Sequence, residues 1–341
     1  MMRKQLLAVA VSGVAALALV SPGADAAPHQ RSTASGVAVK HLDTSKAEHD
    51  RIVAYWTPKR MREAIPGDVL VANRDKSSAT GQVEMGKPTV IQPQAKPGTG
   101  GGGSGFTGGY YPETPVTAVH KTTGKVFFTL GGSRYVCSGS STSSTNGSVV
   151  TTAGHCLNEG PGAFATNFMF APGYNDGATP NGEWTATDLL TTTQWANSGD
   201  FNYDVGFAVV GKNAAGQTLT QAVGTQGIAF NTSSPVYGQT MHSFGYPAAS
   251  PYDGSDLAWC WGTTIRDTFG GSSDYGLNCN LTGGSSGGPW FFGFDGASGT
   301  GTQGSVNSFK YRGGQFKNYM WGPVFGSVVE GVYNVARSTT P

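Results

Sequence analysis

The sequence has 341 residues, with 22 Lys and Arg against 21 Asp and Glu, and a formal net charge of +1 at pH 7. Charged residues make up only 13% of the chain, whereas glycine alone contributes 52 residues. This composition lacks the dense basic patch of a nucleic-acid-binding protein, so we expect no nucleic-acid partner.

The first 26 residues have the features of a secretory signal peptide. Arg3 and Lys4 form a charged start, residues 6–20 are an apolar run, and residues 24–26 (ADA) fit a small-residue cleavage site. The apolar run is shorter than the roughly 20 residues that a membrane-spanning helix needs. We therefore expect a secreted, extracellular protein without a membrane anchor.

Residues 27–114 differ in charge from the remainder of the chain. They carry 11 Lys and Arg against 8 Asp and Glu, whereas residues 115–341 carry 9 against 12. Residues 44–64 are rich in helix formers, with an interruption at Thr57-Pro58. They are too few to build a core of their own, but the stretch is amphipathic enough that we expect it to dock on another surface. A Gly-rich linker follows at 97–105. We interpret 27–114 as a propeptide-like segment with its linker; a permanently attached surface arm is the alternative.

From residue 116 onward the pattern is that of an all-β protein. Short β-branched or aromatic runs alternate with turn residues, and this favours antiparallel barrels. The expected strands are 125–130, 135–137, 148–152, 204–210, 227–230, 239–246 and 304–308. Residues 319–336 predict a C-terminal helix, although Gly322-Pro323 and Gly326 weaken its first half.

The four cysteines are an even number in a chain that we expect to be exported, which favours disulfides. Three pairings are possible, and we favour the local one, Cys137 with Cys156 and Cys260 with Cys279. Each bridge would close a loop of about 20 residues, worth roughly 3 kcal/mol in the loop-entropy model. We expect no metal site, because the spacings typical of zinc ligands are absent.

Three separate segments carry residues suited to nucleophilic catalysis. The segment VVTTAGHC at 149–156 is an apolar strand that ends on His155 beside a cysteine. Asp204 precedes an apolar strand, and Ser286 lies in the glycine-rich segment GGSSGGP at 283–289. A serine hydroxyl needs an adjacent base to become a good nucleophile. Taken alone, the serine segment would equally suit a Gly/Ser turn.

In the order His, Asp, Ser, these segments resemble those of the chymotrypsin-like serine peptidases. VVTTAGHC is similar to the family's T-A-x-H-C signature, and GGSSGGP is similar to its G-x-S-G-G-P loop. The resemblance implies two six-stranded antiparallel β-barrels with a C-terminal helix, built from residues 115–341. It implies Ser286 as nucleophile, His155 as general base and Asp204 as the orienting carboxylate. The N–H groups of Gly284 and Ser286 would form the oxyanion hole.

Other residues compete for two of these roles. Asp200 lies four residues before Asp204, but only Asp204 is followed directly by an apolar strand. His120 lies in a polar stretch and is expected at the surface. His242 alternates within an expected strand, which suits a core histidine.

One residue departs from the pattern of the family's archetypes. They have aspartate directly before the nucleophile, where it pairs with the new N-terminal amine after zymogen cleavage, whereas this chain has Ser285. The chain is therefore more similar to the bacterial branch related to glutamyl endopeptidases. The family's spacing implies a neutral, partly polar substrate pocket, without the aspartate of Arg/Lys specificity or the histidine of strict Glu specificity. Its residues would be Asn280, Leu281, Thr282, Asn307 and Ser308.

The resemblance implies a secreted serine endopeptidase, made as a zymogen, that acts as a monomer on peptide substrates through an acyl-enzyme and without a cofactor. An esterase of the α/β-hydrolase type is excluded, because it requires a histidine after the serine and none follows Ser286. An inactive peptidase homologue that serves as an extracellular binding module is the alternative, although no triad member is missing.

Overall fold

The computed structural model describes residues 36–76, 81–93, 105–232 and 237–341, which all belong to one unit of the chain, residues 31–341. The predicted signal peptide and nearly all of the predicted Gly-rich linker lie outside the described residues. Within these ranges, no helix has the length and apolar character needed to cross a membrane.

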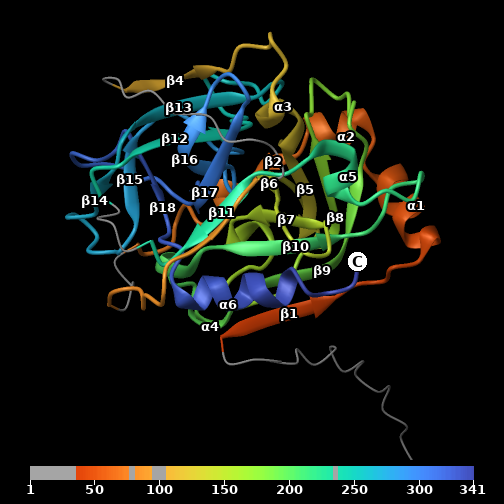
Figure 1. Cartoon of the computed structure of the whole chain (residues 1–341), viewed down its shortest axis with the longest axis horizontal. Coiled ribbons are helices and arrows are strands. Elements are labelled where there is room, and N and C mark those ends of the chain that lie inside the picture. The colour runs from red at the N-terminus through yellow and green to blue at the C-terminus, as the bar shows by residue number, and fades with distance from the viewer. Residues whose placement is uncertain (1–35, 77–80, 94–104, 233–236) are drawn as a thin grey trace, which may run out of the picture. The chain divides into compact units, whose positions relative to one another are not determined.

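Six strands close into an antiparallel barrel in the first half of the predicted peptidase domain (Figure 1). Their order is β9-β10-β7-β6-β5-β8, and β8 pairs back onto β9 to complete the ring. β7 and β10 are buried along their whole length, as expected for apolar strands at the centre of a core. The strands are β5 (Thr123–Leu130), β6 (Ser133–Thr142), β7 (Val149–Thr152), β8 (Thr166–Pro172), β9 (Trp184–Thr192) and β10 (Gly206–Val210).

The second half is built from two further sheets. A seven-stranded sheet has the order β3-β11-β17-β16-β12-β13-β4, and a three-stranded sheet has the order β14-β15-β18. The fold class is therefore confirmed: the chain is mostly β, with a closed six-strand barrel, additional sheets and a C-terminal helix. The strands of the second half are β11 (Gly227–Phe230), β12 (Thr240–Gly245), β13 (Ala258–Thr263), β14 (Ile265–Arg266), β15 (Tyr275–Asn278), β16 (Pro289–Asp295), β17 (Thr300–Val306) and β18 (Tyr319–Gly322).

The C-terminal helix is shorter than predicted. Residues 319–322 form strand β18, which pairs with β15, and α6 spans only Ser327–Ala336. The helix prediction for 319–326 is wrong because Gly322-Pro323 and Gly326 interrupt it, while Met320 and Trp321 are buried through strand pairing. α6 lies along β9 and β10 (Figure 1), and Tyr333 packs its ring on Phe207 and Phe230. The remaining helices of the domain are short: α3 (Ala118–Thr122), α4 (Thr193–Ser198) and α5 (Leu219–Val223), with the 3₁₀ turns η2 (Gly154–Cys156) and η3 (Phe201–Tyr203).

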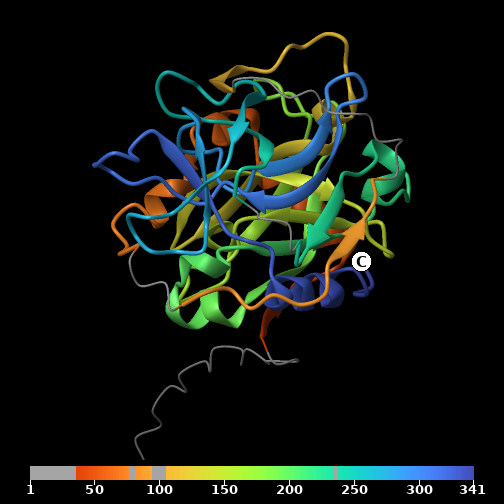
Figure 2. The same ribbon diagram turned by 60° about the vertical axis from the view of Figure 1, so that its left-hand side comes forward.

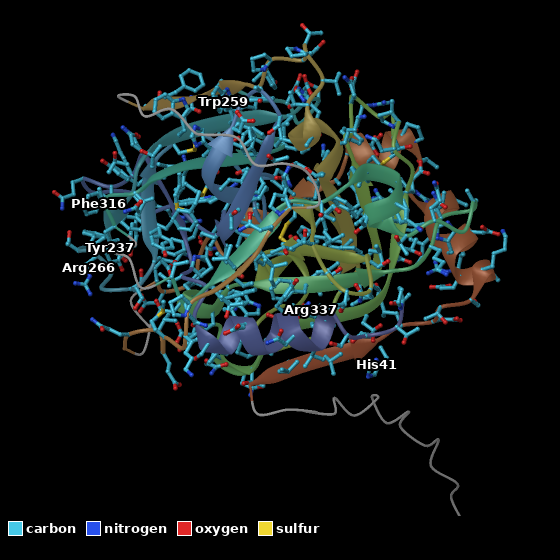
Figure 3. All side chains as sticks on the ribbon, in the orientation of Figure 1. His41, Tyr237, Trp259, Arg266, Phe316 and Arg337 are labelled. Carbon is cyan, nitrogen blue, oxygen red and sulfur yellow. A yellow bond between two sulfur atoms is a disulfide. The ribbon has the colours of Figure 1, made fainter. Side chains whose placement is uncertain are left out.

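The N-terminal segment packs on both large sheets. β1 (Val37–His41) pairs with β9, β2 (Ile65–Pro66) with β6, β3 (Thr89–Ile91) with β11 and β4 (Phe106–Tyr110) with β13. Figure 2 shows β3 lying beside β11. At the end of β1, His41 Nδ1 lies 2.5 Å from Asp188 Oδ1, and Trp259 packs against Phe106 of β4; Figure 3 labels His41 and Trp259.

Two helices and a 3₁₀ turn connect β1 with the remainder of this segment. They are α1 (Lys46–Tyr55), α2 (Pro58–Arg62) and η1 (Gly67–Leu70). The interruption expected at Thr57-Pro58 is confirmed, because Thr57 caps α2 and Pro58 opens it. Between the helices, Trp56 is buried, and its indole N–H donates to the Asn167 carbonyl at 2.7 Å. The predicted docking of this stretch is therefore onto the first barrel.

Candidate active site

His155 and Asp204 form a buried pair at the ends of two neighbouring barrel strands. His155 lies in η2 directly after β7, and Asp204 lies two residues before β10. The His155 backbone N–H donates to Asp204 Oδ1, and ring atom Nδ1 meets Asp204 Oδ2, each at 2.8 Å. A carboxylate only accepts hydrogen bonds, so Nδ1 carries a proton, and in the neutral form of the ring Nε2 is an acceptor. Nε2 is buried, with no hydrogen-bond partner among the described residues.

Asp204 stays ionised although it is completely buried. Burial is the largest effect on its pKa and raises it, but the charge of His155 and three hydrogen bonds hold the pKa below its ordinary value. The third hydrogen bond comes from the Ser308 hydroxyl, at 2.5 Å from Asp204 Oδ2. Ser308 was predicted as a pocket residue, and its contact with Asp204 is one that sequence reasoning missed.

The competing residues have other partners. Asp200 caps η3, where its Oδ1 accepts the Asn202 N–H at 3.0 Å. His120 closes a capping box with Thr117 at the start of α3. His242 is 9% exposed and stacks between Trp259 and Trp261.

Ser286 lies on a tight loop that is held from two sides. Its carbonyl oxygen accepts the Ser138 N–H of β6 at 2.7 Å, and the Ser138 hydroxyl donates to the Gly284 carbonyl at 2.9 Å. Gly284 has φ +95°, and a Cβ there would lie 2.9 Å from the Tyr246 carbonyl oxygen, so only glycine fits. The Ser285 hydroxyl donates to the Thr282 carbonyl at 2.7 Å and so closes the turn locally.

The two predicted oxyanion donors are available. Among the hydrogen bonds recorded for the described residues, none has the N–H of Gly284 or Ser286 as its donor. Two free backbone N–H groups beside a serine nucleophile are the arrangement that stabilises an oxyanion.

A disulfide ties the histidine segment to β6 and so to the serine loop. Cys137 pairs with Cys156, and Cys260 pairs with Cys279, which confirms the local pairing. Cys156 Sγ lies 3.9 Å from the Ser286 carbonyl oxygen. The histidine and serine segments, far apart in sequence, therefore meet at this bridge.

The predicted pocket residues separate into three groups. Leu281, Thr282 and Ser308 line a cavity of about 380 Å³ together with Ser286. Asn280 lines a different cavity and accepts a hydrogen bond from the Tyr252 hydroxyl. Asn307 is buried, and its side chain bonds to Ser285 O, Phe244 O, the Ser243 hydroxyl and the Trp290 indole N–H.

The N-terminal segment contributes the other wall of the cavity that contains Ser286. These residues, which sequence reasoning did not assign to the site, are Asp68, Val69, Val71, Ala72 and Lys76. Burial raises the pKa of Asp68, and the nearby His155 partly opposes that rise. No local pattern marks these residues, because their position depends on the pairing of β2 with the distant β6.

The site does not fit a metal ion. In the described part of the chain, the side chains that could act together as ligands are Cys137, His155 and Cys156, with donor atoms within 4.8 Å of one another. Their two sulfurs are bonded to each other, whereas a metal takes a thiolate as its ligand.

Comparison with known proteins gives relatives that are peptidases. No protein-family model matches the chain. Protease Anisep from Arthrobacter nicotinovorans is 50% identical to this chain, with a TM-score of 0.60. The match covers 64% of this chain and 96% of Anisep. The thermostable serine protease AL20 from an extremophilic microorganism is 46% identical to this chain, also with a TM-score of 0.60. The match covers 65% of this chain and 99% of AL20.

More distant proteins give weaker evidence of relationship. A Glu endopeptidase, 18% identical with a TM-score of 0.52 over 70% of this chain and 99% of its own, shares the fold. A Bacillus subtilis (strain 168) protein named extracellular metalloprotease is 32% identical over 102 residues, so this chain spans about a third of that relative's length. Because the chain covers nearly all of two proteases to which it is 50% and 46% identical, and shares their barrel fold, it belongs to the chymotrypsin-like serine proteases.

Proposed function

We propose that this protein is a secreted serine endopeptidase that cleaves peptide bonds through a His155, Asp204, Ser286 triad and an acyl-enzyme intermediate. The observation that carries the proposal is the hydrogen bonding of His155 to Asp204. One hydrogen bond from ring atom Nδ1 and one from the backbone N–H hold His155 on a buried carboxylate, and Nε2 has no partner among the described residues. An acceptor nitrogen is what a general base requires.

The reaction follows from these groups. Ser286 Oγ attacks the substrate carbonyl carbon while His155 Nε2 takes the hydroxyl proton, and Asp204 stabilises the imidazolium that forms. The N–H groups of Gly284 and Ser286 stabilise the negative charge on the carbonyl oxygen. His155 then returns the proton to the leaving amine, which breaks the peptide bond and leaves the acyl group on Ser286. A water molecule, deprotonated by His155, hydrolyses this ester and restores the enzyme.

The test is covalent trapping of the serine. A small fluorophosphonate probe should modify Ser286, as located by peptide mapping, and Ser286→Ala should abolish both this labelling and peptide hydrolysis. Loss of the nucleophile typically costs on the order of 10⁶ in kcat. Ser338→Ala, an exposed serine near the C-terminus, is the matched control and should behave as wild type. A folded protein that neither labels nor hydrolyses would instead support an inactive homologue.

We propose further that residues 1–26 are removed on export, that 27–114 are a propeptide, and that 115–341 are the mature, monomeric enzyme. The two proteases cover 64% and 65% of this chain, close to the share that 115–341 would make up. N-terminal sequencing of the secreted protein should find starts within residues 98–117. A fully active secreted protein that begins near Ala27 would contradict the propeptide.

A further inference from the structure

We propose that residues 67–76 are a tethered inhibitor of the active-site cleft, in which the Asp68 carboxyl occupies the catalytic centre and the Lys76 side chain is the anchor. The inference rests on the proposed function, because it concerns the regulation of the same His155 and Ser286. It differs from the propeptide proposal in naming the residues that block the site and the way they do so.

The Asp68 carboxyl lies against the serine loop. A Cβ placed on Gly283 would lie 2.1 Å from Asp68 Oδ1, so the carboxyl touches the backbone just before the oxyanion donor Gly284. The same carboxyl is close enough to His155 for the two charges to interact. Its Oδ1 is buried and has no hydrogen-bond partner in the described structure. A substrate carbonyl bound at Ser286 would need the space beside the serine loop that the Asp68 carboxyl fills.

The backbone of the segment passes close to the disulfide on its way to the serine loop. Ile65 and Pro66 pair with Tyr135 and Val136 of β6, and the chain then crosses the disulfide next to His155. A Cβ on Gly67 would lie 2.6 Å from Cys137 Sγ and 3.2 Å from the Val136 carbonyl oxygen. Any side chain at position 67 would therefore push η1 away from the catalytic centre.

Lys76 holds the other end of the segment on two aromatic rings beside the triad. Its Nζ lies 4.5 Å from the ring centroid of Phe201 and 5.8 Å from that of Phe309, which is within cation–π range. The ammonium also donates to the carbonyls of Val71 and Arg74, the latter at 3.0 Å. These bonds fold residues 71–76 back on themselves, so that the segment forms a compact wall of the cavity that contains Ser286.

The segment is arranged as an inhibitor and not as a substrate. A substrate must present a peptide carbonyl carbon to the nucleophile. Here the group that lies against the serine loop is a side-chain carboxyl. The Asp68 carbonyl is used within the turn, where it accepts the Val71 N–H at 3.2 Å. The segment can therefore occupy the cleft without being cleaved at Asp68.

The test uses the intact full-length chain and measures the rate constant of Ser286 labelling by a small fluorophosphonate. Mass spectrometry confirms that the labelled molecules are uncleaved. The variants are Gly67→Ala, Asp68→Ala and the isosteric Asp68→Asn. The matched controls are Gly296→Ala, where a Cβ meets open space, and Asp50→Asn, which is exposed on α1.

A tether supplies an effective concentration in the millimolar range, so a segment with a Kd of about 100 µM would slow labelling about tenfold. Intact wild type should therefore label about tenfold or more slowly than chain from which a second protease has removed the segment. The Gly67 and Asp68 variants should approach the segment-free rate, and both controls should match wild type. A synthetic peptide of residues 65–76 should slow labelling of the segment-free chain.

Equal labelling of intact wild type and segment-free chain would overturn the inference and leave the proposed function standing. Variants that label no faster than wild type would also overturn it. A chain that labels in no form, including after removal of the segment, would overturn the proposed function itself. Gly67→Ala acts through a steric clash and Asp68→Asn through charge, so failure of one variant to fold leaves the other decisive.

Discussion

Removing the two disulfides one at a time should cost equal stability but unequal activity. Both bridges join cysteines that are 19 residues apart, and all four sulfurs are buried. In the loop-entropy model a closed loop of about 20 residues is worth about 3 kcal/mol. The double variants Cys137→Ala/Cys156→Ala and Cys260→Ala/Cys279→Ala should therefore each lose about 3 kcal/mol in free energy of unfolding, measured by urea denaturation of the full chain.

Activity should separate the two variants, because only the first bridge joins segments of the proposed triad. Cys156 follows His155 directly, and Cys137 precedes Ser138, which holds the serine loop by two hydrogen bonds. A displacement of about 1 Å at a catalytic group can cost about 10²-fold in rate. Fluorophosphonate labelling of Ser286, measured after removal of the N-terminal segment, should slow by about that factor in the first variant and by far less in the second. Equal slowing in both would refute the positioning role of the first bridge.

Three further results are expected. Asp204→Asn should lower kcat for peptide hydrolysis about 10⁴-fold, because an amide cannot hold the required histidine tautomer, whereas Asp200→Asn should have a far smaller effect; the reverse order would transfer the role to Asp200. Ser308→Ala should raise the pKa of Asp204, because it removes a donor to the carboxylate, and should move the acidic limb of the kcat profile; an unmoved limb would show that the contact is dispensable. Burial lowers the pKa of His242 to about 4, so the folded state binds fewer protons than the unfolded state below pH 6.5. The free energy of unfolding should therefore fall by about 3 kcal/mol as the pH drops from 6.5 to 4. His242→Phe should flatten this pH dependence in urea unfolding, and a curve parallel to that of the wild type would contradict the argument.

The three segments that we propose to be catalytic could be singled out because their signals are local. A strand that ends on a histidine beside a cysteine, and a serine among glycines, are readable within eight residues each. The structure then shows that Asp204 accepts two hydrogen bonds from His155, whereas Asp200 caps η3. The pocket was harder to predict, because the sequence places Asn307 within an expected strand, 304–308, and does not show that its amide points into the core.

The parts that could not be predicted depend on contacts between distant residues. Tyr319–Gly322 forms a strand because β15 is available to pair with it, and no local feature selects strand over helix. Likewise, the composition of residues 44–64 indicated that the N-terminal segment docks, but not where. Asp68 reaches the serine loop because Ile65 pairs with Tyr135, 70 positions later in the chain.

The placement of β1, β3 and β4 bears on aggregation if the N-terminal segment is removed, as we propose. These three strands are the outermost members of the two large sheets, where they pair with β9, β11 and β13. Unpaired strand edges are templates on which other chains add, and this is a common start of aggregation. While the N-terminal segment is attached, it covers such edges, including the backbone of residues 188–192. The proposed removal of this segment would uncover them, so the chain that keeps the segment should be the form less prone to aggregate, and the shortened chain should stay soluble only at lower concentration.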